Sequence, residues 1–309
     1  MKKQIRGVLL LLLTAMIWGS AFVAQKKGMD YIGPFTYCGI RMIIGSIVLL
    51  PVIAVLGRMK SKKEKQNEID RSKRARLYIK SGVLCGLCLF GGSIFQQFGL
   101  QYTTPGKAGF ITALYVVIVP VLGLFMHKKV TLFSWIGVVL AIAGFYLLCI
   151  KEGFQISNGD FLVLICAIMF SFHILVIDHY SPMVDGIILS CIQFFVCGSI
   201  CIILMFLFEK PGFSAIWDAR GSILYAAIFS SGVAYTLQII AQKDVPPVIA
   251  TLLMSLESVF SALTGWLILH DEMTFKELSG CVIVFIAVIL AQLPQGKSDE
   301  TAVETTNEN

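Results

Sequence analysis

Residues 238–272, QIIAQKDVPPVIATLLMSLESVFSALTGWLILHDE, decide the fold because their apolar centre is long enough to cross a membrane. That centre, Pro247–Leu269, carries a single charged side chain, Glu257. A helix of about 20 apolar residues spans the hydrocarbon core of a bilayer. We therefore expect a membrane-spanning helix with Glu257 near the midplane.

Glu257 is the first candidate for a functional group. A charged side chain at the centre of a spanning helix costs about 2.5–3.5 kcal/mol on insertion scales, and such residues usually face the bundle interior or a wet cavity. The functional interpretation is a group that handles a ligand or a proton. The structural alternative is a protonated or hydrogen-bonded glutamate that only holds helices together.

The same stretch has a counterpart in the first half of the chain. Three groups of matching residues recur in the same order: Gln97, Gln101 and Pro105 with Gln238, Gln242 and Pro246; His127, Thr131 and Gly137 with His270, Thr274 and Gly280; Gly7 and Trp18 with Gly159 and Phe170. Their separations differ because the loop after Leu56 is longer than the loop after Phe208. The pattern indicates an internal duplication.

The composition is that of a helical membrane protein. The chain is 57% hydrophobic and 14% charged, with a mean hydropathy of +0.81, whereas a soluble protein carries about 25% charge. Continuous apolar runs exclude a β-barrel, whose strands would alternate. The net charge of +6 comes largely from one basic loop, so nucleic-acid binding is not expected. All nine cysteines lie in apolar runs, and Cys85 and Cys88 are interpreted as packing residues within a helix rather than as a redox or metal pair.

Ten membrane-spanning helices are predicted. Their expected ranges are Gly7–Lys26, Gly33–Leu56, Lys80–Leu100, Gly106–Met126, Thr131–Ile150, Asp160–Ile177, Gly186–Phe208, Gly221–Ala241, Pro247–Leu269 and Phe275–Leu293. The first resembles a signal peptide, but its cleavage site around Ala24 is poorly formed and further spans follow, so we expect it to be retained.

Lysine and arginine are distributed unevenly between the two sides of these spans. Seventeen lie on the side of the N-terminus and seven on the other, and cytoplasmic loops carry the excess. Both ends are therefore predicted to be cytoplasmic, in a multi-pass protein of the cell membrane. Because each half has an odd number of spans, the second repeat would be inverted. The predicted domains are repeats at 7–150 and 159–293 and a disordered cytoplasmic tail at 294–309.

Charged segments outside the spans point to no soluble domain. The basic loop from Arg58 to Lys80 is expected to be a solvated connector that fixes topology, with binding to anionic lipid headgroups as the alternative. No GxxxxGK[ST] motif occurs, so no nucleotide site is predicted, and no cofactor or metal is expected.

Two pairs of glutamines lie inside or at the ends of the spans. Gln97 and Gln101 are four residues apart and share a helix face, as do Gln238 and Gln242. An amide both donates and accepts hydrogen bonds, so each pair could bind polar groups of a ligand or bond a neighbouring helix. Both interpretations stay open.

Three further residues are candidates for the lining of a cavity. Arg41 lies a third of the way along the second span, where extension of the side chain to the membrane surface is slightly favoured over anion recognition. Trp18 lies mid-helix and either stacks on a ligand or fills the core. His173 is interpreted as a hydrogen-bonded packing residue in preference to a proton relay.

The chain resembles the drug/metabolite transporter superfamily, in its ten-helix EamA-like branch. The resemblance rests on WGSAF at 18–22, GPFTYCGIRMIIGSIVLLP at 33–51, GLQYTTPGKAGFITALYVVIVPVLGL at 99–124, SGVAYTLQIIAQ at 231–242 and SLESVFSALTGWLILHDEMTFKELSG at 255–280. The family's usual Glu-Pro in the ninth helix is Glu257-Ser258 here, so a helix-kinking proline is missing. The acidic residue that usually closes the fourth helix is replaced by His127-Lys128-Lys129.

The resemblance implies a central cavity between inverted halves. It also implies that the first, third, fourth, sixth, eighth and ninth spans line this cavity, with the fifth and tenth more peripheral. The favoured function is secondary transport of small organic metabolites, such as amino acids or drugs, in the outward direction. Glu257 would then either carry a proton across or stay ionised against a substrate ammonium group.

A membrane enzyme acting on a lipid-linked substrate is the alternative function. Such enzymes need clustered acids or histidines near an interface, often with a metal. The run His270-Asp271-Glu272 is such a cluster, although the chain has no HExxH motif. The prediction remains a transporter that is not an enzyme, whose partners are the lipid bilayer and a small-molecule substrate.

Overall fold

The computed structural model describes residues 2–60, 68–103, 105–125, 130–149, 157–264, 266–267 and 274–291. Every regular element in these residues is a helix, and they contain no strand. The tail predicted at 294–309 and the run His270-Asp271-Glu272 lie outside the described residues.

The first half of the chain forms α1 (Lys2–Gly28), α2 (Pro34–Lys60), α3 (Glu68–Tyr102), α4 (Pro105–Ala113), α5 (Tyr115–Phe125) and α6 (Leu132–Cys149). The second half forms α7 (Asn158–Tyr180), α8 (Gly186–Phe208), α9 (Phe213–Asp218), α10 (Arg220–Tyr225), the π-helix η1 (Ala226–Tyr235), α11 (Thr236–Ala241), α12 (Pro247–Met254), α13 (Glu257–Thr264) and α14 (Phe275–Ala291).

Within the described residues, eight helical stretches are long and apolar enough to cross a membrane. Two shorter apolar helices, Leu132–Leu147 and Leu278–Leu290, coincide with the fifth and tenth predicted spans. Large apolar side chains are exposed on the outside of the bundle, as lipid contact requires. They include Leu9, Phe195, Ile203, Phe206, Val282 and Ile289.

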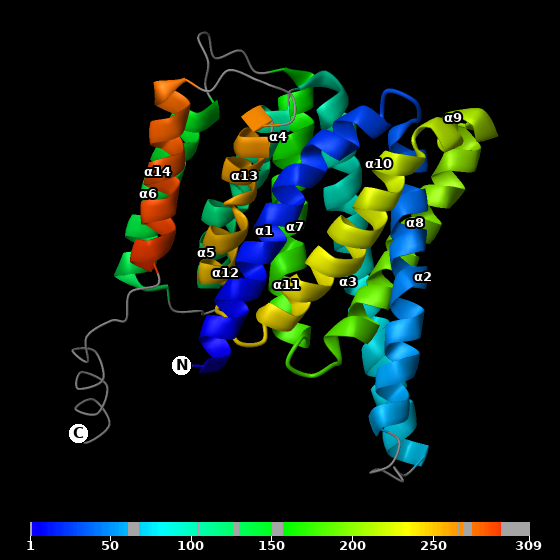
Figure 1. Ribbon diagram of the computed structural model, residues 1–309. Helices are drawn as coiled ribbons and strands as arrows, with labels where there is room; N and C mark the ends of the chain where they lie inside the picture. Colours follow the sequence, from blue (N-terminus) through cyan, green and yellow to red (C-terminus); the bar gives the residue numbers. More distant parts are fainter. Residues whose placement is uncertain are drawn as a thin grey trace, which may run out of the picture.

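The helices form a bundle with a clear order across its width (Figure 1). The pair α6 and α14 stands at one edge, and α2, α3 and α8 stand at the other. The first helix, α1, runs obliquely between them and contacts η1 and α10 to α13. The cavity described below lies among the helices that α1 contacts and their neighbours.

The predicted spans Gly106–Met126 and Pro247–Leu269 are each broken into two helices, which differs from the prediction. The helices break at Leu114 and at Ser255–Leu256, where a backbone N–H bonds to the carbonyl three residues earlier instead of four. The Leu114 N–H donates to the Ile111 carbonyl at 3.2 Å, and the Leu256 N–H donates to the Leu253 carbonyl at 3.3 Å. The Ser255 hydroxyl donates to the Leu252 carbonyl at 2.8 Å, a bond that competes with the regular helix ladder.

The two broken spans pack antiparallel to each other. α4 contacts α13 and α5 contacts α12, so the two breaks lie at the same level. The residues that follow the breaks are Tyr115 and Glu257, each the first residue of its second helix. Their side chains therefore meet where all four helix segments come together.

The predicted span Gly221–Ala241 also departs from a regular α-helix. Its middle, Ala226–Tyr235, is a π-helix. Such segments are rare and occur often at functional sites, because the extra residue per turn changes the direction of the following side chains. Ser230 and Tyr235 in this segment both face the cavity.

Near the end of the bundle opposite the start of α1, α8 caps the beginning of α2 (Figure 1). The Glu209 carboxylate accepts hydrogen bonds from the backbone N–H groups of Phe35 at 2.8 Å and Thr36 at 2.7 Å. A negative charge there also complements the positive end of the helix dipole. At the other end, α3 already begins at Glu68, so the loop predicted from Arg58 to Lys80 is largely helical in its described part.

Candidate functional site

A cavity of about 470 Å³, its opening included, lies between the two halves of the chain. Its walls come from α1, α3, α4, α5, α7, η1, α11, α12 and α13, with one residue from α2. These helices belong to the first, third, fourth, sixth, eighth and ninth predicted spans, as the family resemblance implied, and Arg41 adds the second.

Glu257 reaches the cavity because the chain breaks just before it. Its side chain is 4% exposed, and the Tyr115 hydroxyl donates a hydrogen bond to its Oε1 at 3.0 Å. No basic side chain in the described part of the chain forms an ion pair with it. A carboxyl group that faces a cavity with one hydrogen-bond donor can still accept a proton or bind a cationic group.

Arg41 is buried and faces the same cavity, at 2% exposure. The sequence favoured an arginine extended to the membrane surface, and the structure contradicts this because α8 and η1 pack over that side of α2. Its guanidinium lies 5.8 Å from the centre of the Tyr37 ring. Among the described residues no carboxylate pairs with it, and its Nε has no hydrogen-bond partner.

Tyr235 lines the same cavity as these two charged groups. It lies close enough to both Arg41 and Glu257 for electrostatic interaction with each. Its ring centre is 4.7 Å from that of Trp18, whose Nε1 donates to the Ser230 carbonyl at 3.3 Å. Trp18 therefore lines the cavity and holds η1 against α1, and its stacking on a ligand stays a prediction.

His173 also lines the cavity, from α7. Its Nε2 lies 3.0 Å from the Gln193 Oε1 of α8, and the ring is 1% exposed. The hydrogen bond agrees with the packing role that the sequence favoured. The ring also forms part of the cavity wall, and a role in proton relay stays a prediction.

The glutamines differ in where they point. Gln238 lines the cavity, and its Oε1 has no hydrogen-bond partner among the described residues. Gln242 instead donates to the Ile174 carbonyl at 3.3 Å and lies outside the lining. Gln97 is buried but does not line the cavity, and Gln101 is exposed. Depth in the membrane and the repeat also predict that Gln97, Gln238 and Glu257 share one central space, and this is wrong for Gln97, since only the other two line the cavity.

Sequence reasoning missed two other glutamines of the cavity wall. Gln96 lines it in place of Gln97, and its Nε2 donates to the Thr112 hydroxyl at 3.2 Å. Adjacent residues on a helix point about 100° apart, so the repeat match identified the helix but not its inward face. Gln25 also lines the cavity, and its Oε1 has no partner in the described region.

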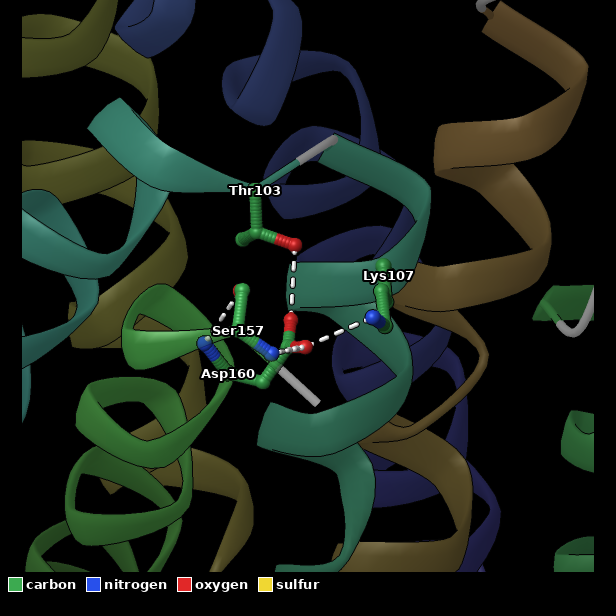
Figure 2. Close-up of polar contacts among 4 residues, drawn as sticks. All are labelled: Thr103, Lys107, Ser157 and Asp160. Carbon is green, nitrogen blue, oxygen red and sulfur yellow. Dashed lines mark hydrogen bonds and ion pairs between the residues drawn. The ribbon is translucent and has the colours of Figure 1, made fainter. Parts of the chain in front are cut away.

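A separate polar cluster ties α4 to α7 near one end of the bundle (Figure 2). The Asp160 carboxylate accepts hydrogen bonds from Thr103 Oγ1 at 2.8 Å and from the Ser157 N–H at 2.7 Å, and it forms an ion pair with Lys107 Nζ at 2.6 Å. Ser157 and Asp160 cap α7 reciprocally. This cluster fixes the start of α4, which leads into the cavity wall at Thr112.

Comparison with known proteins assigns the family. The model of the EamA-like transporter family matches the chain twice, over residues 5–150 and 157–293. The chain belongs to the EamA-like transporter family. With its apolar helices, this EamA-like protein is a multi-pass membrane protein and a membrane transporter.

Relatives of this EamA-like transporter cover nearly its whole length. An uncharacterized transporter of Archaeoglobus fulgidus is 32% identical over 300 residues, which cover 94% of this chain and 87% of the relative. The uncharacterized transporter YoaV of Bacillus subtilis is 22% identical, with 93% and 97% coverage. A WAT1-related chloroplastic protein of Arabidopsis thaliana is 23% identical, with 90% and 67% coverage.

A solved crystal structure shares the fold of this EamA-like transporter. It superposes with a TM-score of 0.73 and covers 98% of this chain and 99% of its own, at 16% sequence identity. The superposition therefore extends over both halves of the chain, including the helices that build the cavity.

Proposed function

We propose that the chain is a secondary transporter that exports zwitterionic small metabolites, such as amino acids, by alternating access around the cavity. One observation carries the proposal. Arg41 and Glu257, of opposite charge, face one cavity, and neither has an ion-pair partner among the described residues.

A zwitterion satisfies both groups at once. A guanidinium offers planar donors that match a carboxylate, and a carboxylate accepts hydrogen bonds from an ammonium group. An unpaired buried charge is unfavourable, so each group favours a ligand that brings the opposite charge. Tyr235, close to both Arg41 and Glu257, can hydrogen-bond to the ligand between them.

The rest of the wall suits a side chain of mixed character. Gln25 and Gln238 each have an amide oxygen without a partner among the described residues, so they can accept hydrogen bonds from a polar substituent. Trp18 and Phe170 offer aromatic faces for an apolar one. We therefore expect several related amino acids to be accepted.

The proposed architecture is ten spans in two inverted repeats of five helices, at 7–150 and 159–293. The antiparallel contacts of α4 with α13 and of α5 with α12 support it, since inverted copies would cross in this way. The first residues after the two breaks, Tyr115 and Glu257, are 142 positions apart, between the separations of the flanking sequence matches. The short apolar helices α6 and α14 would be the fifth and tenth spans.

The experiment compares matched compounds in liposomes that contain the purified protein. An amino acid, its carboxamide and its deaminated acid are tested for exchange against labelled amino acid. We expect exchange with the amino acid only. Arg41→Gln should remove the preference for the acid over the amide, and Glu257→Gln should remove the preference for the amine over the deaminated acid.

The exposed residue Gln101 provides the matched control, since it lies outside the cavity. Gln101→Ala should exchange the same compounds as the unmodified protein. Equal exchange of amino acid, amide and deaminated acid by the unmodified protein would overturn the proposal.

A further inference from the structure

Three cysteines meet inside the bundle where α2 packs against α8. The sulfur atoms of Cys38, Cys197 and Cys201 all lie within 4.8 Å of one another. Each of the three residues is fully buried at 0% exposure, and none lines the cavity. Their spacing does not group them, because Cys38 is far from the other two along the chain.

Close approach of the two helices brings the sulfur atoms together. Gly39 and Gly198 each face the partner helix, and a Cβ atom on Gly198 would lie only 2.9 Å from Ile43. A Cβ atom on Gly39 would lie 3.2 Å from the Cβ of Cys201. Cys197 and Cys201, four residues apart, share the face of α8 that this contact covers.

The donor set favours a soft metal ion. In this group the three ligand atoms are all sulfur, and no histidine or carboxylate of the described chain joins them. Thiolates select Cu(I), Zn²⁺ and iron–sulfur clusters. A structural Zn²⁺ site takes four ligands, whereas three sulfur atoms can complete the coordination of Cu(I).

Arg41 supplies the charge that such a site needs. It follows Cys38 by one helical turn and lies close enough to Cys38 and Cys197 for electrostatic interaction. Metal binding requires deprotonated thiols, whose charge would be unfavourable inside the membrane without a compensating cation. Three thiolates and one Cu(I) carry a net charge of −2, and the Arg41 guanidinium reduces it to −1.

We propose that Cys38, Cys197 and Cys201 bind one Cu(I) ion beside the cavity. The ion would link α2 to α8 as a resident ligand, separate from the transported substrate. Arg41 can serve both sites, because a guanidinium has five N–H donors and its two edges can face different partners. The proposal does not depend on the proposed amino-acid transport.

The chain offers a matched control in the CxxC of α3. Cys85 and Cys88 also place two thiols one turn apart inside a spanning helix. Cys85 packs in an apolar cluster with Ile177, Val184 and Leu189, and no third ligand joins the pair among the described residues. Replacing these two residues therefore leaves the three-sulfur site intact.

The test is a titration of the purified protein in detergent, without oxygen, with Cu(I) held by an excess of bicinchoninate. We expect one Cu(I) to transfer from the coloured chelator complex to each protein molecule. Cys38→Ser and Cys201→Ser should each weaken binding by about tenfold or more, since even loss of an outer-shell partner has effects of 10- to 100-fold. The double variant Cys85→Ser/Cys88→Ser should bind as the unmodified protein does.

X-ray absorption on the Cu(I)-loaded double variant gives a readout that needs no further substitution. Three sulfur neighbours at the metal, and no nitrogen or oxygen, are expected. Failure to take Cu(I) from the chelator, unchanged affinity in a folded Cys38→Ser variant, or a mixed nitrogen or oxygen shell would each overturn the proposal. Preference for Zn²⁺ in a parallel titration would overturn the assignment to Cu(I).

Discussion

Glu257 and Arg41 are buried in different ways, and the difference defines what each can bind. Glu257 has one neutral donor, the Tyr115 hydroxyl, on its carboxyl group. Arg41 faces an aromatic ring and thiol groups. Neither environment supplies a full opposite charge, so under the proposed function a ligand or a proton would neutralise Glu257 and an anionic group of the ligand would neutralise Arg41.

At Glu257 we predict that the substitution Glu257→Gln stops transport while the protein still folds. Glutamine keeps the size of the side chain and can still accept from Tyr115, but it can neither carry a proton nor neutralise an ammonium group. Loss of one partner of a buried charge pair costs about 2–5 kcal/mol, so substrate affinity should fall by more than about tenfold. Binding is measured by the shift of the thermal unfolding temperature with added amino acid.

The same variant separates the two roles of the carboxyl group. If Glu257 carries a proton, a pH gradient across the liposome membrane drives transport by the unmodified protein and not by Glu257→Gln. If it only holds the ammonium group, the gradient has no effect on either protein. Normal transport per folded molecule with lower thermal stability would contradict both roles and assign Glu257 to helix packing.

Charge and repeat matches predicted part of this site, because they mark residues that are unusual inside a membrane. Arg41, Glu257 and Gln238 were identified in this way and line the cavity. Tyr115 and Tyr235 were missed, since a tyrosine in an apolar helix is as consistent with packing as with contact to a ligand. Tyr115 directly follows the break in its span and Tyr235 ends the π-helix, and hydropathy predicts neither feature.

At the scale of elements, regular spans were easier to predict than interrupted ones. The expected range Gly186–Phe208 coincides with α8. The break before Glu257 was not expected, since the family's proline is Ser258 here, and apolar residues flank the break on both sides. The Ser255 hydroxyl bonds to the preceding turn at this break, and hydropathy carries no signal of that bond.

The Asp160 cluster yields a prediction about the packing of α4 against α7. Asp160→Asn keeps the shape of the side chain but removes the charge that Lys107, Thr103 and the α7 N-terminus share. Hydrogen bonds to charged groups contribute about 1.5–3 kcal/mol each, so we expect about 2 kcal/mol of destabilisation and a lower unfolding temperature. The exposed Asp218→Asn is the control, and an equal effect of both variants would contradict the role of the cluster.

Across the whole molecule, several helix ends gather at the same end of the bundle. The start of α1, the end of α2 and the end of α14 are at the same end of the helices (Figure 1). The excess of lysine and arginine predicts that this end is cytoplasmic. The predicted number of spans and their predicted orientation rest on hydropathy and charge alone and stay predictions, whereas the contacts between the two halves required the fold.

We therefore predict that reporters fused at Lys65 and after Asn309 are both cytoplasmic. A reporter inserted at Gly212, between α8 and α9, should be found on the outer face and serves as the control. Fluorescent and alkaline phosphatase fusions, active on opposite sides of the membrane, measure this directly. An outer-face signal at Lys65 or at the C-terminus would contradict the model of ten spans.

The hydrogen bond from Tyr115 to Glu257 joins equivalent positions of the two proposed repeats. A homodimer built from one such repeat would set either two phenols or two carboxyls against each other at its symmetry axis. Two carboxyls so close could not both ionise. In this chain the two diverged halves set the Tyr115 phenol against the Glu257 carboxyl instead, so the two halves are not interchangeable. Co-expressed separate halves should restore transport only as a mixed pair.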